Sequence, residues 1–192
     1  MALLKSVICG LDEKMKSMFY FDEYIKECET KHFWEEALFY LESAFLAHPT
    51  CEKINSLVGF SWYYFIEGPR MEGKSWAYAN TVALEKWANY IEIGLETYIN
   101  NPSFCFIAGY TLLIHGFLIE KYQSNSERIG LDILNKALSS DKTDLNDVVS
   151  IILQYQKQRK YKPIKMDIDI LKRVFPSDSL LDRYFIEIHG KC

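Results

Sequence analysis

The sequence lacks an apolar run long enough to cross a membrane. Its longest uncharged run, FCFIAGYTLLIHGFLI, spans residues 104–119 and contains His115. This run falls short of the roughly 20 apolar residues that a spanning helix needs. We therefore expect a central helix that is buried on all sides, and no membrane partner.

The sequence also lacks the cysteine pattern of a disulfide scaffold. The cysteines are odd in number and match no such spacing; they are Cys9, Cys28, Cys51, Cys105 and Cys192. Reduced thiols in a reducing compartment are the simplest interpretation. The first residues, MALLKSVICGLDEK, show no secretory signal, so we expect a cytoplasmic location.

No excess of positive charge is present. The formal net charge is −4, which argues against nucleic acid as the main partner because phosphate binding needs a basic face. The same charge is compatible with a basic protein partner. One basic cluster, interleaved with tyrosines, suits single-stranded nucleic acid, but we favour charges that complement a helix C-terminus. The cluster contains Lys157, Arg159, Lys160, Lys162 and Lys165.

Aromatic residues are plentiful, at 15% of the chain. We expect a core built from large rings, with some rings on a binding surface, where aromatic side chains are favoured anchors.

Apolar residues at steps of three and four predict helices along most of the chain. The predicted helices span residues 11–28, 34–48, 50–67, 75–100, 101–122, 124–138 and 144–153. Stop and capping signals mark their ends: Pro49, Thr50, Asn101 with Pro102, the capping box of Ser124 and Glu127, and Asp144. The aromatic stretch 57–67 can also be read as a strand, although its helical neighbours favour a helix. In the tail, KMDIDIL alternates like a short strand, and Ser177 can cap a last helix.

No low-complexity linker divides the chain. We expect one all-α domain over residues 1–192, with helical hairpins over 1–160 and a C-terminal appendage over 161–192. Three turns follow similar phrases, ESAFLAHP, GLETYINNP and LNKALSSD, which resemble tetratricopeptide-type (TPR-like) hairpins over residues 31–153. In such hairpins a small residue lets paired helices approach closely, and Ala44, Gly94 and Ala137 are the candidates. The spacing is uneven, so a short solenoid and a compact helical bundle both remain open.

A phosphate-binding loop motif, GPRMEGKS, covers Gly68, Gly73, Lys74 and Ser75. In such a loop backbone N–H groups cradle phosphates, the lysine reaches the terminal phosphates and the serine holds Mg²⁺. Residues 60–67 can supply the preceding strand. Against this hypothesis stand the negative charge of Glu72 and the missing strand–helix alternation of a parallel sheet. We favour a helix–helix turn capped by Ser75, with a nucleotide-binding enzyme as the alternative function.

Other chemical motifs are weaker. His48-x-x-Cys51 and His189-x-x-Cys192 share a spacing of zinc-ligand type, and Cys28 and His32 form an i, i+4 pair. We favour a structural turn at His48 and a frayed tail at His189, and we predict no metal and no other cofactor. Cys105 and His115 lie about 15 Å apart along one helix, too far for a catalytic pair, so each is expected in the core.

We therefore predict a non-enzymatic protein-binding module that uses an acidic, aromatic-bearing face. The segment PSFCFIAGYTLLIHGFLI, in a small acidic helical chain, looks like that of small bacterial immunity proteins. The resemblance implies tight one-to-one masking of a toxin domain, often a basic nuclease, with buried aromatic anchors that slow dissociation.

Overall fold

The computed structural model describes residues 17–67, 76–138, 143–158 and 166–190. Within these ranges the regular structure is entirely helical, which confirms the all-α prediction. The α-helices are α1 (Glu23–Lys31), α2 (Trp34–Ala47), α3 (Cys51–Glu67), α5 (Trp76–Thr97), α6 (Pro102–His115), α7 (Ser126–Ala137), α8 (Asp144–Gln158), α9 (Ile168–Val174) and α10 (Leu180–Gly190); the 3-10 helices η1 (Gly116–Leu118) and η2 (Glu120–Tyr122) follow α6. No helix within the described residues is both long and apolar enough to span a membrane.

Local signals placed several helix ends correctly. Asn101 caps α6, where its side chain accepts hydrogen bonds from the N–H groups of Ser103 and Phe104, and Pro102 follows as the first helical residue. Proline is tolerated there because its missing N–H has no partner in the first turn. The hydroxyl of Thr50 accepts a hydrogen bond from Lys53 N at 3.4 Å at the start of α3.

Helix α1 begins at Glu23, so the prediction of a helix over residues 11–28 is wrong for residues 17–22. Asp22 caps α1 by accepting hydrogen bonds from Tyr24 N and Ile25 N. The irregular segment before α1 is held by long-range hydrogen bonds instead, because Tyr20 N donates to Glu52 O at 3.1 Å and to Ser56 Oγ at 2.7 Å. Residues 11–16, the first part of this predicted helix, lie outside the described residues.

Two other helix starts and one helix end differ from the prediction. Helix α6 ends at His115 rather than near residue 122, and the chain continues through η1 and η2. The Ser124–Glu127 capping box does not form, because α7 starts at Ser126 after Asn125. At α8 the hydroxyl of Thr143 accepts from Asn146 N, while Asp144 pairs with Arg173 instead of capping.

The strand-like KMDIDIL segment is helical from Ile168 onward, and its first residue lies outside the described residues. Asp167 accepts a hydrogen bond from Asp169 N at 2.8 Å and caps α9. Leu171 and Val174 are the buried residues of this short helix, and their spacing of three residues places them on one helical face. At α10 the capping hydroxyl belongs to Ser179, which accepts from Asp182 N at 3.1 Å, and not to Ser177.

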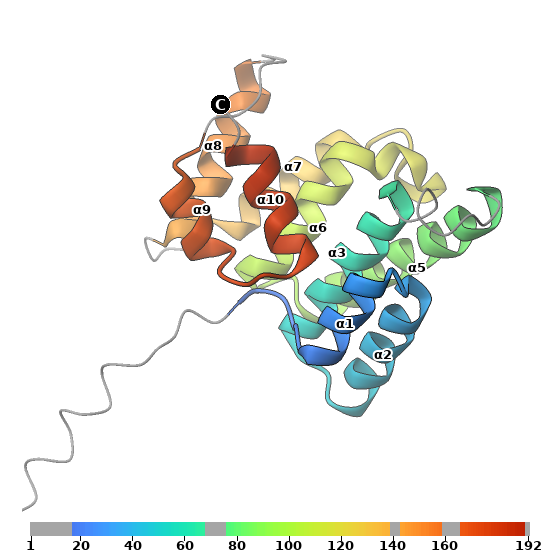
Figure 1. Cartoon of the computed structure of the whole chain (residues 1–192). Coiled ribbons are helices and arrows are strands. Elements are labelled where there is room, and N and C mark those ends of the chain that lie inside the picture. Colours follow the sequence, from blue (N-terminus) through green and yellow to red (C-terminus); the bar gives the residue numbers. More distant parts are fainter. Residues whose placement is uncertain (1–16, 68–75, 139–142, 159–165, 191–192) are drawn as a thin grey trace, which may run out of the picture.

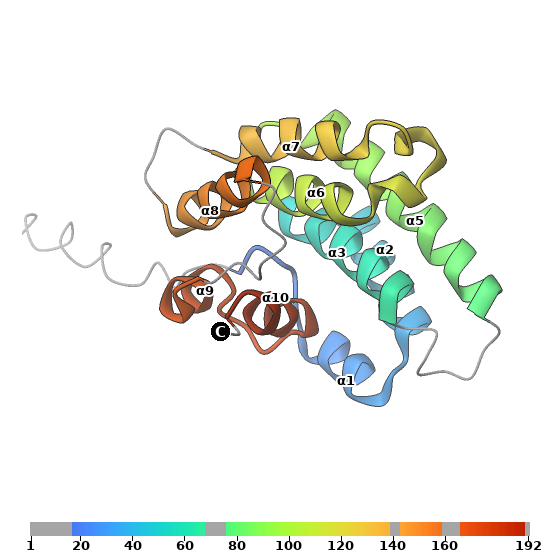
Figure 2. The same cartoon turned by 90° about the horizontal axis from the view of Figure 1, so that it is seen from above.

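Helix α6 lies at the centre, between α7 and α3, and Figure 2 shows the three as successive layers. Residues 104–112 are all buried, as predicted for a central helix, but the end of the predicted run is not, because Phe117 and Leu118 are exposed. A Cβ on Gly94 would lie 2.0 Å from a ring carbon of Phe104, so this glycine makes room for that ring, while the TPR-like pairing of helices stays a prediction. A Cβ on Gly130 would lie 2.6 Å from Leu113 N, so glycine allows α7 to approach α6.

The C-terminal helices return to the middle of the chain. Phe185 of α10 lies 6.4 Å from Trp62 of α3, 5.5 Å from Phe106 of α6 and 4.8 Å from Phe175, measured between ring centroids. Figure 1 shows α10 beside α3 and α6, from which it is distant in sequence. Because each repeat of an open solenoid contacts only its neighbours, a solenoid does not predict this contact.

Candidate protein-binding surface

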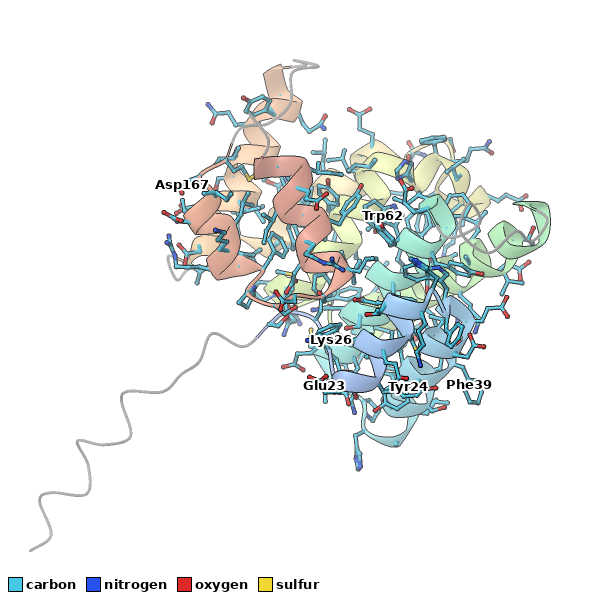
Figure 3. The ribbon with its side chains drawn as sticks, viewed as in Figure 1. Glu23, Tyr24, Lys26, Phe39, Trp62 and Asp167 are labelled. Carbon is cyan, nitrogen blue, oxygen red and sulfur yellow. The ribbon has the colours of Figure 1, made fainter. Side chains whose placement is uncertain are left out.

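Helices α1 and α2 expose large apolar side chains. Phe39 and Leu46 are 71% and 79% exposed, the highest values among the large apolar residues of the described chain. Phe33 and Tyr24, at the ends of the same two helices, are also exposed. Figure 3 shows Phe39 at one edge of the molecule, beside the ribbon of α2. We call this region, residues 22–48, the α1–α2 face.

The exposure follows from a helix that is apolar on two sides. The inward side of α2 carries four buried residues: Trp34, Ala37, Leu38 and Leu41. Phe39 and Leu46, seven residues apart, point the other way. The outer side of α2 therefore carries large apolar side chains that the described part of the chain leaves exposed.

The α1–α2 face also concentrates negative charge. Residues 22–48 contain seven Asp or Glu and two Lys, a formal charge of −5, whereas the whole chain carries −4. Helix α2 itself has three glutamates and no lysine or arginine. On α1, one lysine is already engaged, since Lys31 and Glu27 form an exposed i, i+4 ion pair at 2.5 Å.

A groove of about 410 Å³ lies between the two helices. It is lined by Tyr24, Glu35, Glu36, Phe39, Tyr40 and Ser43. The rings of Tyr24 and Tyr40 lie 4.7 Å apart, so aromatic surface lies beside the two carboxylates. No cationic side chain is among these lining residues.

Asp22 holds the aromatic side of this groove in place. Its carboxylate accepts hydrogen bonds from Tyr40 Oη at 2.6 Å and from Tyr20 Oη at 2.9 Å, besides capping α1. Burial acts to raise the pKa of Asp22, but these hydrogen bonds, led by that from Tyr40, outweigh it and lower the pKa below its usual value. Asp22 is therefore a charged structural anchor that fixes the Tyr40 ring.

A second groove, of about 330 Å³, lies on the other side of Phe39. Glu35 and Phe39 line both grooves and form a shared wall. In this second groove Glu42 accepts hydrogen bonds from Lys86 and Tyr90 of α5. The chain thus supplies a cation, Lys86, to this second groove.

The residues of the phosphate-loop motif, Gly68, Gly73, Lys74 and Ser75, lie outside the described residues. The segment before them is described, and residues 60–67 form the last turns of α3. The strand reading of this stretch is therefore wrong, because its apolar residues pack against helices. Without that strand, the described part of the chain does not provide the strand–loop–helix context of a phosphate-binding loop.

The metal-ligand hypotheses gain no support among the described residues, which contain no group of three or more His, Cys, Asp or Glu side chains able to hold a metal. His189 is buried, and its Nε2 lies 3.0 Å from Tyr110 Oη, so the predicted frayed tail is wrong. Burial lowers the pKa of His189 to about 4. Cys192 lies outside the described residues. His32 lies beyond the end of α1 with φ 60°, so Cys28 and His32 do not share a helical face.

The other chemical candidates are structural. Cys105 Sγ donates a hydrogen bond to Ile99 O at 3.0 Å, and burial raises its pKa to about 11, which keeps the thiol protonated. His115 Nδ1 accepts from Trp62 Nε1 at 3.0 Å. Cys105 is therefore in the core as predicted, whereas His115 is only half-buried. Of the basic cluster, residues 159–165 lie outside the described residues, and Lys157 is exposed at the end of α8.

A cavity of about 640 Å³ is lined in part by Cys51. Burial raises the pKa of Cys51, so the thiol is poorly suited to act as a nucleophile. Asn101 accepts a hydrogen bond from Ser103 Oγ at 2.8 Å, and Asn55 Nδ2 donates to Ser103 Oγ at 2.9 Å. This network provides hydrogen bonds at the start of α6. It contains no base that could activate the Ser103 hydroxyl or the Cys51 thiol.

A scan of protein-family models and searches of curated proteins and solved structures gave no match to this chain. Sequence reasoning predicted an acidic, aromatic-bearing face but did not locate it. The signal was available, because Phe39 and Leu46 do not fall on the apolar stripe of Trp34, Leu38 and Leu41.

Proposed function

We propose that this protein is a protein-binding module whose α1–α2 face binds a basic protein partner. The observation that supports this best is the exposure of Phe39 and Leu46 on a helix whose charged residues are all glutamates. Large apolar residues are the usual anchors of interfaces, and a surrounding ring of charge steers a partner of opposite sign. No catalytic step enters this proposal.

Our more specific proposal is that the partner is a toxin domain, such as a basic nuclease, and that this protein acts as a cytoplasmic immunity protein. Masking of this kind needs fast association with a cationic surface and slow dissociation. The carboxylates of the α1–α2 face suit the first need because opposite charges raise the association rate. The apolar ridge suits the second because desolvated anchors slow dissociation.

The test is a capture experiment with matched variants. The full chain is immobilised and exposed to lysate of the cells that encode it, beside a Phe39→Ser/Leu46→Ser double variant. Phe117→Ser is the control, because Phe117 is an exposed aromatic residue of η1, away from α2. We expect one basic protein to be retained by the wild type and by the control, but lost with the double variant.

The retained protein is then purified and titrated against the same variants. An affinity loss of about 2 kcal/mol or more with the double variant, and none with Phe117→Ser, would support the α1–α2 face as the interface. A partner that is acidic, or whose binding ignores Phe39 and Leu46, would refute the proposal.

The toxin proposal has its own readout. The identified partner is expressed alone and together with this protein, and growth is measured. Growth arrest that is relieved by the wild type but not by the Phe39→Ser/Leu46→Ser variant is expected. A harmless partner would refute the immunity role while leaving the binding function intact.

A further inference from the structure

The segment after α6 is held at both ends by side-chain hydrogen bonds to other helices. It comprises η1 and η2, and we call its residues, 116–122, the η segment. At its start, Trp62 Nε1 of α3 donates a hydrogen bond to His115 Nδ1 at 3.0 Å. At its end, the hydroxyl of Tyr122 donates to the carboxylate of Glu92 on α5. The η segment therefore has two anchors on two different helices.

The first anchor requires a neutral histidine. An indole nitrogen can only donate, so Nδ1 of His115 has to accept with its lone pair. A protonated imidazole carries a hydrogen on both nitrogens and has no lone pair to offer. The Trp62 side chain is fully buried, so its N–H would then face a second donor in a place that excludes water. A buried donor without an acceptor costs free energy, and the anchor is lost.

The surroundings of His115 favour the neutral ring. Its side chain is half-buried, and burial lowers its pKa below the usual value, although the C-terminus of α6 favours a cation. The rings beside it, those of Trp62 and Phe117, do not titrate. Burial, and no charged side chain, is the cause of the lowered pKa. The neighbouring helices carry charged residues of their own, which are Glu67 on α3, Glu120 and Lys121 on η2, and Glu127 and Arg128 on α7.

Acid weakens this first anchor. The folded protein binds a proton at His115 less tightly than the unfolded chain, in which the histidine has its usual pKa of 6.5. The stabilising contribution of the neutral ring is therefore complete above about pH 6.5 and is lost as the pH falls through the lower pKa of the folded state.

The second anchor keeps its charge over the same range. Burial acts to raise the pKa of Glu92, but hydrogen bonds from Lys121 and Tyr122 outweigh it and lower the pKa below the usual value. Glu92 therefore stays ionised at about pH 5 and above. Burial raises the pKa of Tyr122, so its hydroxyl remains a donor. Mild acid thus weakens one end of the η segment and leaves the other end in place.

The η segment covers apolar surface between its two anchors. Ile119 and Tyr122 are buried. Leu118 and Ile119 also line a groove of about 340 Å³ together with Phe65 of α3 and Leu84 of α5. Movement of the η segment away from α3 would therefore widen this groove and expose its apolar lining.

We propose that the Trp62–His115 hydrogen bond is an acid-sensitive switch. While the ring is neutral, it holds the η segment against α3. When the ring takes up a proton, the η segment separates from α3 at its His115 end and stays tied to α5 through Glu92. This inference does not depend on the proposed α1–α2 face.

The first test follows the indole N–H signals of the full chain by heteronuclear NMR from about pH 7.5 to about pH 5. The signal that Trp62→Phe removes belongs to Trp62. Trp87 is the internal control, because its buried indole donates to Thr111 Oγ1, a hydroxyl that does not titrate in this range. We expect the Trp62 signal to shift or broaden with a midpoint below about pH 6.5, and the Trp87 signal to stay in place.

Hydrogen exchange measures the opening itself. After correction for the intrinsic effect of pH on exchange, the opening of residues 116–122 should rise about fivefold or more between about pH 7 and pH 5. Residues 104–112 of α6, which are all buried, should change less than about twofold.

Two variants of His115 assign the effect to this side chain. In His115→Asn the amide oxygen takes the place of Nδ1 as acceptor and binds no proton, so the pH dependence of opening should disappear. His115→Ala has no acceptor, so its η segment should be open to the same extent at both pH values. Other buried groups that titrate in this range lie on α1 and α10 and are common to all variants, so these comparisons cancel them; they are Glu29, Asp182 and His189.

Two results would overturn the inference. One is a Trp62 signal that moves with pH in His115→Asn as it does in the wild type, because the proton would then bind elsewhere. The other is wild-type exchange of residues 116–122 that is the same at both pH values. Neither result involves Phe39 or Leu46, so the proposed binding function stands or falls separately.

Discussion

Glu29 offers a sharp test of the structure because its carboxylate is buried where α1 meets α10. The side chain is 7% exposed, and its Oε2 accepts a hydrogen bond from Leu180 N at 3.0 Å. Burial raises the pKa of Glu29 to about 7, although the Leu180 N–H and the nearby Arg183 oppose the rise. Glu29→Gln keeps an oxygen that can accept from Leu180 N but cannot ionise.

The expected magnitude follows from linkage between protonation and folding. A rise of the pKa from 4.5 to about 7 corresponds to about 3 kcal/mol, at 1.36 kcal/mol per pKa unit. Because the folded state binds the proton more tightly than the unfolded state, this stabilising contribution is complete below about pH 4.5 and is lost as the pH rises through about 7. The Glu29→Gln variant should therefore gain stability relative to wild type as pH rises, by up to about 3 kcal/mol near pH 8.

The assay is urea unfolding of the wild type and of Glu29→Gln at about pH 5, 6.5 and 8. Comparing the two proteins at each pH cancels the titration of other groups. Glu127→Gln, on the exposed side of α7, is the matched control and should follow the wild type at every pH. A stability difference between wild type and Glu29→Gln that does not change with pH would refute the burial of a proton-binding Glu29.

Three further predictions test the core and the alternative function. Gly94→Ala should lower the free energy of unfolding by about 1–3 kcal/mol, because its methyl group would overlap the Phe104 ring; an unchanged urea midpoint would contradict this contact. Phe185→Ala should cost about 3–5 kcal/mol, measured in the same way, because the ring is fully buried among aromatic side chains; a loss below about 1 kcal/mol would show that α10 does not share the core. Millimolar ATP or GTP with Mg²⁺ should leave the melting temperature unchanged; a rise that Lys74→Ala abolishes would restore the nucleotide-binding alternative.

Helix signals could be read from the sequence wherever the deciding contacts are local. Asn101 and Pro102 predict the start of α6 because a capping side chain and a preset φ act within one turn. Signals of the same kind failed where a distant residue competed. Asp144 was predicted to cap α8, but its carboxylate accepts two hydrogen bonds from Arg173. The apolar alternation of KMDIDIL matched a strand, yet residues 168–174 form a helix because their buried side chains lie three residues apart.

The candidate surface shows the same division. Composition and charge predicted an acidic face with aromatic residues, and the concentration of charge in residues 22–48 can be counted from the sequence alone. The sequence alone does not show which apolar side of α2 faces the core. Both sides carry large apolar residues, and the choice depends on the fit of Trp34 against Phe60 and the rings near it.

The all-α class, the central buried helix and the acidic character were therefore set by residue types and their spacing, because periodicity and formal charge are properties of the chain itself. The return of α10 to α3, the burial of Glu29 and His189, and the exposure of Phe39 and Leu46 were decided only in the folded molecule. Each of them depends on contacts between segments far apart in sequence, and the free energy of such contacts is fixed by shape and burial rather than by local pattern.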